Sequence, residues 1–306
     1  MADPAAFHRA ERIASLPLIE VGRHGGFLTG TGQAIRDIWH RRELLGLLVR
    51  RELKARYKNS SLGLVWSLMR PLSQLLIYYF AVGQIIGLAR AIPDFAIFVF
   101  VGLTAWMLFS EIVSNATVSI IHNQGLVKKV YLPREIFPLA SVGSALFNFA
   151  VQFLILVAAM VALQRVPLTG EILYAVAAFI MLVTFATALG VLLAGVTVYA
   201  RDLEHLVEVV LAVLFWASPV VYSFGFVRDV IGGTVLEQIY LANPITIAVM
   251  GFQRGLWIAG SDPANGIVWP PDMAWRMLAV FLFSLVLLWV SQRLFSRIQG
   301  NFAQEL

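Results

Sequence analysis

Six apolar runs constrain the fold of this 306-residue chain more than any other feature. They lie at about residues 64–89, 95–120, 136–163, 172–199, 206–226 and 274–295. About 18 apolar residues are enough to cross the hydrocarbon core of a bilayer. A spanning segment in lipid must satisfy its own backbone hydrogen bonds, so each run is expected to be a helix. The sequence therefore predicts an all-α integral membrane protein with six transmembrane helices, in a transmembrane domain over residues 63–300.

The composition agrees with a membrane protein. Charged residues make up 13% of the chain, against about 25% in a soluble domain. The net charge of +5 does not indicate nucleic-acid binding, because the cations lie mostly beside apolar runs. Residues 1–33 contain no continuous apolar segment typical of a cleaved signal peptide, so they are expected to form a cytoplasmic tail. The absence of Cys excludes disulfide bonds and thiolate metal sites.

The distribution of cations predicts the orientation. With the N-terminus inside, eighteen of the 23 Lys and Arg residues fall on the inner side of the membrane. The outer side holds five: Arg90, Arg165, Arg228, Arg254 and Arg276. The positive-inside rule then predicts a multi-pass protein of the cytoplasmic (inner) membrane with both termini in the cytoplasm, including a short C-terminal tail at 301–306.

The segment at 236–258 does not fit a simple crossing. Asn243, Pro244 and Gly251 interrupt an otherwise apolar stretch. A full crossing here would place Arg293 and Arg297 outside the cell. We favour a pair of re-entrant helices that enters from the outer face, because its uninterrupted apolar pieces are too short to span. A full crossing is the alternative.

Residues 34–62 are expected to form an interfacial amphipathic helix followed by a basic segment. An apolar stripe at helical spacing supports the helix and consists of Ile35, Ile38, Trp39, Leu45 and Val49.

The motifs of several enzyme classes are missing. The chain has no G-x-x-x-x-G-K-[ST] phosphate loop, no H-E-x-x-H and no pair of His residues at i, i+4 spacing. Its Asp residues are also too scattered for a magnesium-dependent transferase. We therefore expect no catalytic residue, no metal and no cofactor in this chain. If ATP drives the protein, another subunit binds the ATP.

Polar and aromatic residues in the apolar runs are candidates for lining a transport path, because sugar faces stack on aromatic rings. An acid inside a bilayer is costly unless it is paired or wet, so Glu111 either lines the path or forms an interhelical hydrogen bond with Asn148 or Gln152. The small residues Ala186, Gly190 and Ala194 predict close helix packing. The candidate path residues are Tyr78, Tyr79, Trp106, Phe109, Glu111, Phe215, Trp216 and Tyr222.

Three stretches resemble a known family, and the resemblance covers residues 35–300. They are RRELKARYKNSSLGLVWSLMRPL, NQGLVKKVYLPREIFPLA and LANPITIAVMGFQRGL. They resemble the membrane subunits of type-2 ABC exporters for lipid-linked polysaccharides such as O-antigen, teichoic acid and galactan. Within the family, RELKARYKNSSLG and KKVYLPREIFPLASVGSALFN look most similar to the actinobacterial galactan branch.

The resemblance implies a homodimer that works with two copies of a separate ATPase, which would bind ATP and Mg²⁺. Residues 123–135 would form a coupling helix seated on that ATPase, with the loop at 201–205 as a second contact. Apolar residues interleaved with cations, including Leu126 and Val127, are typical of an amphipathic helix that docks in a groove. The re-entrant pair around Asn243 and Pro244 would act as an outer gate. The coupling candidates are Asn123, Leu126, Lys128, Lys129, Tyr131, Arg134, Glu135, Arg201, Asp202 and Glu204.

A basic cluster before the first apolar run has two interpretations. It contains Arg50, Arg51, Lys54, Arg56 and Lys58, of which the residues at 50, 54 and 58 share a helical face. Such a cluster orients a membrane protein. It also attracts anionic head groups, such as the pyrophosphate of a lipid-linked glycan, at about 1 kcal/mol per cation. We expect both roles.

The sequence as a whole favours the permease subunit of an exporter for an undecaprenyl- or decaprenyl-pyrophosphate-linked polysaccharide, with galactan as a candidate. An exporter of drugs or lipids on the same scaffold is the first alternative. A membrane-embedded glycosyl or prenyl transferase is the second.

Overall fold

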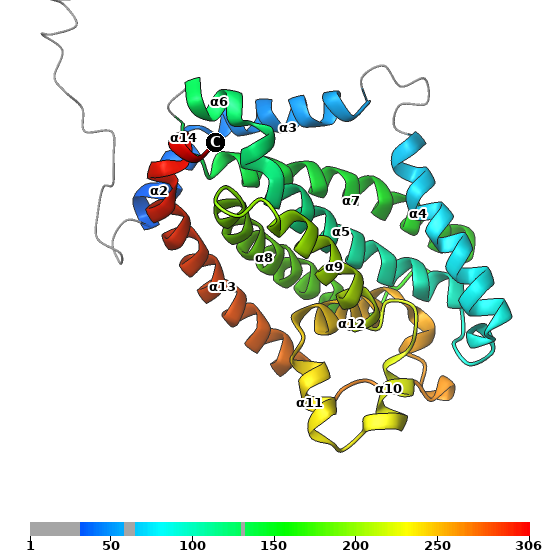
Figure 1. Cartoon of the computed structure of the whole chain (residues 1–306). Helices are drawn as coiled ribbons and strands as arrows, with labels where there is room; N and C mark the ends of the chain where they lie inside the picture. Colours follow the sequence, from blue (N-terminus) through cyan, green and yellow to red (C-terminus); the bar gives the residue numbers. More distant parts are fainter. Residues whose placement is uncertain (1–30, 58–64, 130–131) are drawn as a thin grey trace, which may run out of the picture.

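A computed structural model describes residues 31–57, 65–129 and 132–306, and within these ranges the chain forms helices and no strand (Figure 1). The longer helices are α3 (Arg42–Tyr57), α4 (Val65–Tyr78), α5 (Phe95–His122), α7 (Ile136–Ala162), α8 (Ile172–Thr197), α9 (Leu203–Trp216), α12 (Pro244–Leu256) and α13 (Met273–Ile298). The shorter ones are α2 (Thr31–His40), α6 (Gln124–Lys129), α10 (Phe224–Ile231), α11 (Val235–Ala242) and α14 (Phe302–Glu305). A π-helix, η1 (Tyr79–Ile85), continues α4, and 3-10 turns lie at Leu88–Arg90, Ile258–Gly260, Pro263–Asn265 and Gln299–Asn301.

Four described helices are long and apolar enough to cross a bilayer: α5, α7, α8 and α13. They match four of the six predicted runs. At the other two runs, α9 contains 14 residues, and α4 contains 14 residues that the π-helix η1 extends by seven. A 14-residue helix is about 21 Å long, which is less than the hydrocarbon thickness of about 30 Å. Six crossings therefore stay a prediction.

The run predicted at 206–226 is not one helix. Helix α9 ends at Trp216, and Pro219 follows three residues later. The residue before a proline disfavours the α conformation, so Ser218 cannot continue the helix. A new helix, α10, begins at Phe224, where the Ser223 hydroxyl accepts a hydrogen bond from the Gly225 amide at 3.3 Å. The interpretation of 206–226 as a single helix is therefore wrong for its second half.

Helix α5 lies at the centre of the fold and packs against α7, α8 and α12. Its contact with α8 depends on the small residues that the sequence singled out. Ala186 and Ala194 are fully buried, and a Cβ atom added at Gly190 would lie 2.7 Å from the Cβ of Ala116 in α5. The predicted close packing of helices at this face is confirmed.

The predicted helix break at Asn243 and Pro244 is also confirmed. Helices α11 and α12 meet there at an angle of 78°. The Asn243 side chain caps α12 by accepting a hydrogen bond from the Ile245 amide at 3.0 Å, and Pro244 occupies the first helical turn. Helix α12 is buried against α8 and α5, and Nδ2 of Asn243 donates a hydrogen bond to the Ser218 hydroxyl at 3.2 Å, so the break contacts protein. Such a bend suits either a broken span or a re-entrant pair, and the re-entrant pair stays our prediction.

The molecule has two distinct ends (Figure 1). Helices α3, α6 and α14 lie together at one end with the C-terminus, whereas α10 and α11 lie at the opposite end. Residues 34–62 were expected to form one interfacial helix with a basic segment. The described part of that region forms two helices, α2 and α3, with Leu48 buried against the protein and Trp39 exposed. Their interfacial position stays a prediction.

Three of the five cations assigned to the outer side have partners within the chain. Arg165 pairs with Asp94 at 3.2 Å, and Arg254 pairs with Glu171 at 3.3 Å. Arg276 donates a hydrogen bond to the Gln238 side chain at 2.8 Å. These contacts give the three arginines a structural role that is independent of membrane orientation.

The α5–α8 contact generates a stability prediction. Gly190→Val adds atoms where a Cβ alone already meets Ala116, so we expect a loss of about 1–3 kcal/mol in the free energy of unfolding, as for overpacked cores. Thermal unfolding in detergent measures it. Gly170→Val is the matched control, since a Cβ there meets nothing within 4 Å. Equal melting temperatures for the two variants would contradict the tight contact.

Candidate functional site

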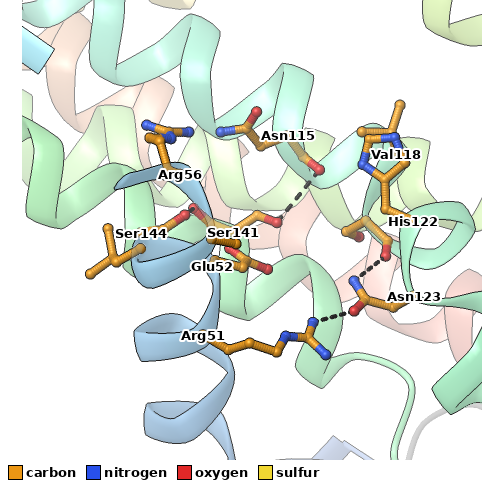
Figure 2. Close-up of a pocket in the computed structure, with 12 residues that line it drawn as sticks. Arg51, Glu52, Arg56, Asn115, Val118, His122, Asn123, Ser141 and Ser144 are labelled. Carbon is orange, nitrogen blue, oxygen red and sulfur yellow. Dashed lines mark hydrogen bonds between the residues drawn. The ribbon is translucent and has the colours of Figure 1, made fainter. Parts of the chain in front are cut away.

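A pocket of about 290 Å³ lies where α3 meets the C-terminal end of α5 and the N-terminal end of α7 (Figure 2). Its lining is mostly polar and contains two guanidinium groups. The lining residues are Arg51, Glu52, Leu53, Ala55 and Arg56 of α3, Asn115, Val118, Ser119, His122 and Asn123 of α5 and its end, and Ser141 and Ser144 of α7. Cations and side-chain amides are donors of the kind that bind phosphate.

Arg56 forms an ion pair that joins α3 to the middle of α5. Its Nη1 lies 2.6 Å from Oε1 of Glu111. The same carboxylate oxygen accepts a hydrogen bond from Nδ2 of Asn148 in α7, also at 2.6 Å. The interhelical bond expected between Glu111 and Asn148 is therefore confirmed, whereas Gln152 donates to the Thr104 hydroxyl instead. The partnership with Arg56 was not expected, because nothing local in the sequence links positions 55 residues apart.

Arg51 connects the pocket to the start of the expected coupling loop. Its Nη2 donates a hydrogen bond to Oδ1 of Asn123, and Nδ2 of Asn123 donates to the Ser119 carbonyl at 2.8 Å. Asn123 follows the last residue of α5 and directly precedes α6. One side chain thus connects the pocket wall to the first element of the expected coupling loop.

Glu52 brings a carboxyl group into the same pocket. Burial raises the pKa of Glu52, while a hydrogen bond with the Ser144 hydroxyl and the nearby cations Arg51 and Arg56 act in the opposite direction. A raised pKa lowers the cost of neutralising the group by protonation. That reduces its repulsion of a bound anion.

The structure divides the basic cluster between two faces of α3. Arg51 and Arg56 line the pocket, whereas Arg50 and Lys54 are exposed on another face. Lys58 lies outside the described residues. The i, i+4 spacing of Arg50 and Lys54 therefore marks a solvent- or lipid-facing surface, and the pocket uses the neighbouring positions.

Five of the eight candidate path residues form one aromatic cluster. Tyr78 lies 5.5 Å from Phe215 between ring centroids, Trp106 lies 5.4 Å from Phe215, and Phe109 and Trp216 extend the group. The Tyr222 hydroxyl donates to the Trp216 carbonyl at 2.7 Å, whereas Tyr79 contacts Phe80 instead. The rings of Trp106, Phe109 and Phe215 are buried within the chain, but that of Trp216 is 59% exposed. Their role in a path stays a prediction, with Trp216 as the member most open to a substrate.

The expected coupling loop begins with the short helix α6. Its Val127 is buried against this chain's own core, whereas Gln124, Gly125 and Lys128 are exposed. The expectation that the apolar face docks into a partner therefore fails for Val127, because this side chain already packs against other residues of the same chain. The polar face is the one available to a partner. Nothing is described of the Lys129 side chain, and Tyr131 lies outside the described residues.

Two other coupling candidates are held by the end of α13, by the 3-10 turn after it and by the tail predicted at 301–306. The guanidinium of Arg134 lies over the ring of Phe302 at 5.6 Å. Glu135 is buried and accepts hydrogen bonds from Ser296 and Gln299, both at 3.2 Å, and its burial raises its pKa. Phe302 is itself fully buried. A six-residue end with one aromatic ring has no periodicity that would reveal this packing.

The second loop is more exposed. Arg201 and Asp202 are exposed and Glu204 is partly buried, directly before and within the first turn of α9. Tyr199, just upstream, donates to the Ile298 carbonyl at 2.9 Å and contacts the ring of Phe302. The C-terminal segment therefore touches the first predicted coupling loop and Tyr199, which lies two residues before the second.

The described residues of the pocket form an arrangement suited to binding an anion. They contain no group of three His, Asp or Glu residues placed to hold a metal ion. The pocket presents donors to an anion, and the long apolar helices beside it define a multi-pass membrane protein.

Comparison with known proteins identifies the class more closely. Residues 43–257 match the ABC-2 type transporter family, and the chain belongs to that family. It is 29% identical over 275 residues to the O-antigen export system permease protein RfbA of Myxococcus xanthus, covering 89% of this chain and 98% of that protein. It is 24% identical over 265 residues to a protein of the same name from Klebsiella pneumoniae, covering 86% and 95% respectively. The chain is therefore a membrane-embedded transport subunit rather than an enzyme, and its partner is an ATP-binding subunit.

The geometry of α6 predicts which positions reach that partner. We expect Lys128→Cys to crosslink to a cysteine on the ATP-binding subunit in the assembled complex, since Lys128 is exposed. Val127→Cys is the matched neighbour and is expected not to crosslink, since Val127 is 5% exposed. Gel analysis with a short bifunctional maleimide measures both. Crosslinking at 127 but not at 128 would reverse the assignment of the two faces.

Proposed function

We propose that this chain is the permease subunit of an exporter that carries a polyprenyl-pyrophosphate-linked polysaccharide across the cytoplasmic membrane. The observation that carries the proposal is the similarity to O-antigen export permeases over nearly the whole length of both chains. The polyprenyl chain would be undecaprenyl or decaprenyl. Galactan is our candidate glycan, on the resemblance of residues 51–63 and 128–148 to the galactan branch.

The working unit would be a homodimer of this chain with two copies of the ATP-binding subunit, which would bind ATP and Mg²⁺. No cofactor is assigned to this chain. The end that carries α3, α6 and the C-terminus would face the cytoplasm, in agreement with the excess of Lys and Arg there. The exposed surfaces of α6 and of the 201–205 loop would meet the ATP-binding subunits. The bend at Asn243 and Pro244 would close the outer end of the path.

The pyrophosphate of the substrate lies at the inner leaflet, which is the depth proposed for α3. The pocket volume of about 290 Å³ is at the lower limit for small-molecule sites. It therefore suits a compact charged head group and leaves the polysaccharide to the path between subunits. Exposed Arg50 and Lys54, with Lys58, would attract the head group to the surface of α3 before it enters.

Export by a variant with three substitutions tests the proposal. Arg50→Gln, Lys54→Gln and Lys58→Gln together remove three cations of the cluster and leave Arg51 and Arg56 in place. We expect the variant to insert, dimerise and bind its ATP-binding subunit, but to export lipid-linked glycan at least about tenfold more slowly, given about 1 kcal/mol per cation near the membrane surface. Glycan reaching the cell surface is measured with a lectin or an antibody.

The matched control removes the same charge elsewhere on the inner side. Arg9→Gln, Arg12→Gln and Arg23→Gln in the N-terminal tail are expected to leave export unchanged. Both variants are compared at one ionic strength, because exposed charges are screened over about 8–10 Å. Full export by the inserted α3 variant would reduce the cluster to a topology signal. Normal surface glycan in cells that lack the chain altogether would contradict the proposed function itself.

A further inference from the structure

Arg56 reaches the pocket already bound to an anion of the protein itself. Its guanidinium pairs with Glu111 at 2.6 Å, and the two side chains are 41% and 23% exposed. The pair therefore lies at the border between the pocket and the interior of the helices. It is open enough for a ligand to reach the guanidinium.

The position of Glu111 explains why this pair forms. The residue belongs to α5, whose most apolar window is 78% buried within the chain. A carboxylate at such a place costs several kcal/mol unless it is paired. Arg56 supplies the charge, and Asn148 supplies a second hydrogen bond from α7. If Arg56 turns to another anion, Asn148 still holds the carboxylate.

The pocket contains further hydrogen-bond donors for a phosphate besides Arg56. A guanidinium carries five N–H donors, and the bond to Glu111 accounts for only one nitrogen of Arg56. Arg51 lines the same pocket, together with the amide of Asn115 and the imidazole of His122. A diphosphate has several oxygens for these donors, whereas a phospholipid phosphodiester carries a single charge, like the carboxylate that it would have to replace.

We propose that Glu111 is an internal counter-ion that occupies Arg56 until an anionic head group displaces it. This inference rests on the proposed function, since it names the device by which the head-group pocket stays closed. Competition with Glu111 sets a minimum affinity that an anion needs in order to bind Arg56. Weakly bound phospholipid phosphates leave Arg56 with Glu111, and only a diphosphate with several simultaneous contacts takes it. Displacement also releases the one ion pair found between α3 and α5 in the described residues.

Binding of farnesyl pyrophosphate to the complex with the ATP-binding subunit tests this inference. Isothermal titration in detergent gives the dissociation constant for wild type and for Glu111→Gln. Loss of the competing carboxylate is expected to tighten binding about fivefold, the equivalent of about 1 kcal/mol for a partly exposed ion pair. Arg56→Gln is expected to weaken binding about tenfold or more, and adding Glu111→Gln to it should change nothing further.

Glu43→Gln is the matched control, since it removes an exposed acid from α3, the helix that carries Arg56. The inference is overturned if Glu43→Gln increases the affinity for farnesyl pyrophosphate as much as Glu111→Gln does. It is also overturned if Glu111→Gln still increases that affinity when Arg56 is replaced by Gln. Unchanged or weaker binding by Glu111→Gln overturns it as well. If that variant fails to assemble, Arg56→Gln decides alone, and unchanged affinity refutes a role for the pair. If the wild-type complex exports glycan and these substitutions leave the affinity for farnesyl pyrophosphate unchanged, the counter-ion role is refuted and the proposed exporter function stands.

Discussion

Every polar group that this chain brings near the hydrocarbon core needs a partner within the protein, because lipid tails offer none. Two sets of contacts between helices follow from this requirement. Glu111 is satisfied by Arg56 and Asn148, and those two bonds fasten α3 and α7 to the central helix α5. At the other end, Arg254 pairs with Glu171 and lies over the ring of Tyr174, and these contacts hold α12 against the start of α8. A charged group is unfavourable away from water unless it is paired, so its pairing stabilises the contact between the two helices.

The contacts at the α3 end also place the proposed head-group pocket beside the expected coupling loop. Arg51 lines the pocket and binds Asn123, which directly precedes α6. A ligand that draws on Arg51 therefore acts on the residue from which the expected coupling loop starts. The C-terminal segment supports the same region, because Phe302 packs against Arg134 of that loop and Tyr199 before the second loop. The proposed head-group pocket and the proposed contact with the ATP-binding subunit would thus share one small polar and aromatic framework.

Local chemistry made much of the fold predictable. Long apolar runs became α5, α7, α8 and α13, and the dipeptide Asn243-Pro244 became a capped helix break. The extent of α9 was misjudged because Pro219 was weighed less than the apolar run around it. Contacts between distant segments were harder to predict. The partner of Glu111 in α7 was among the alternatives, but its partner in α3 depends on where an interfacial helix lies, and no periodicity encodes that. For the same reason, helical spacing grouped Arg50 with Lys54, whereas the pocket uses Arg51 and Arg56.

The central claim is that the pocket beside α3 binds a polyprenyl pyrophosphate and is connected to the ATP-binding subunit through Asn123. The most direct measurement is the ATP hydrolysis rate of the assembled complex in nanodiscs, with and without saturating polyprenyl pyrophosphate. The account predicts that the lipid changes the rate of the wild-type complex, and that the same concentration of a neutral polyprenol does not. A hydrolysis rate that stays constant while the pyrophosphate lipid is bound would contradict it.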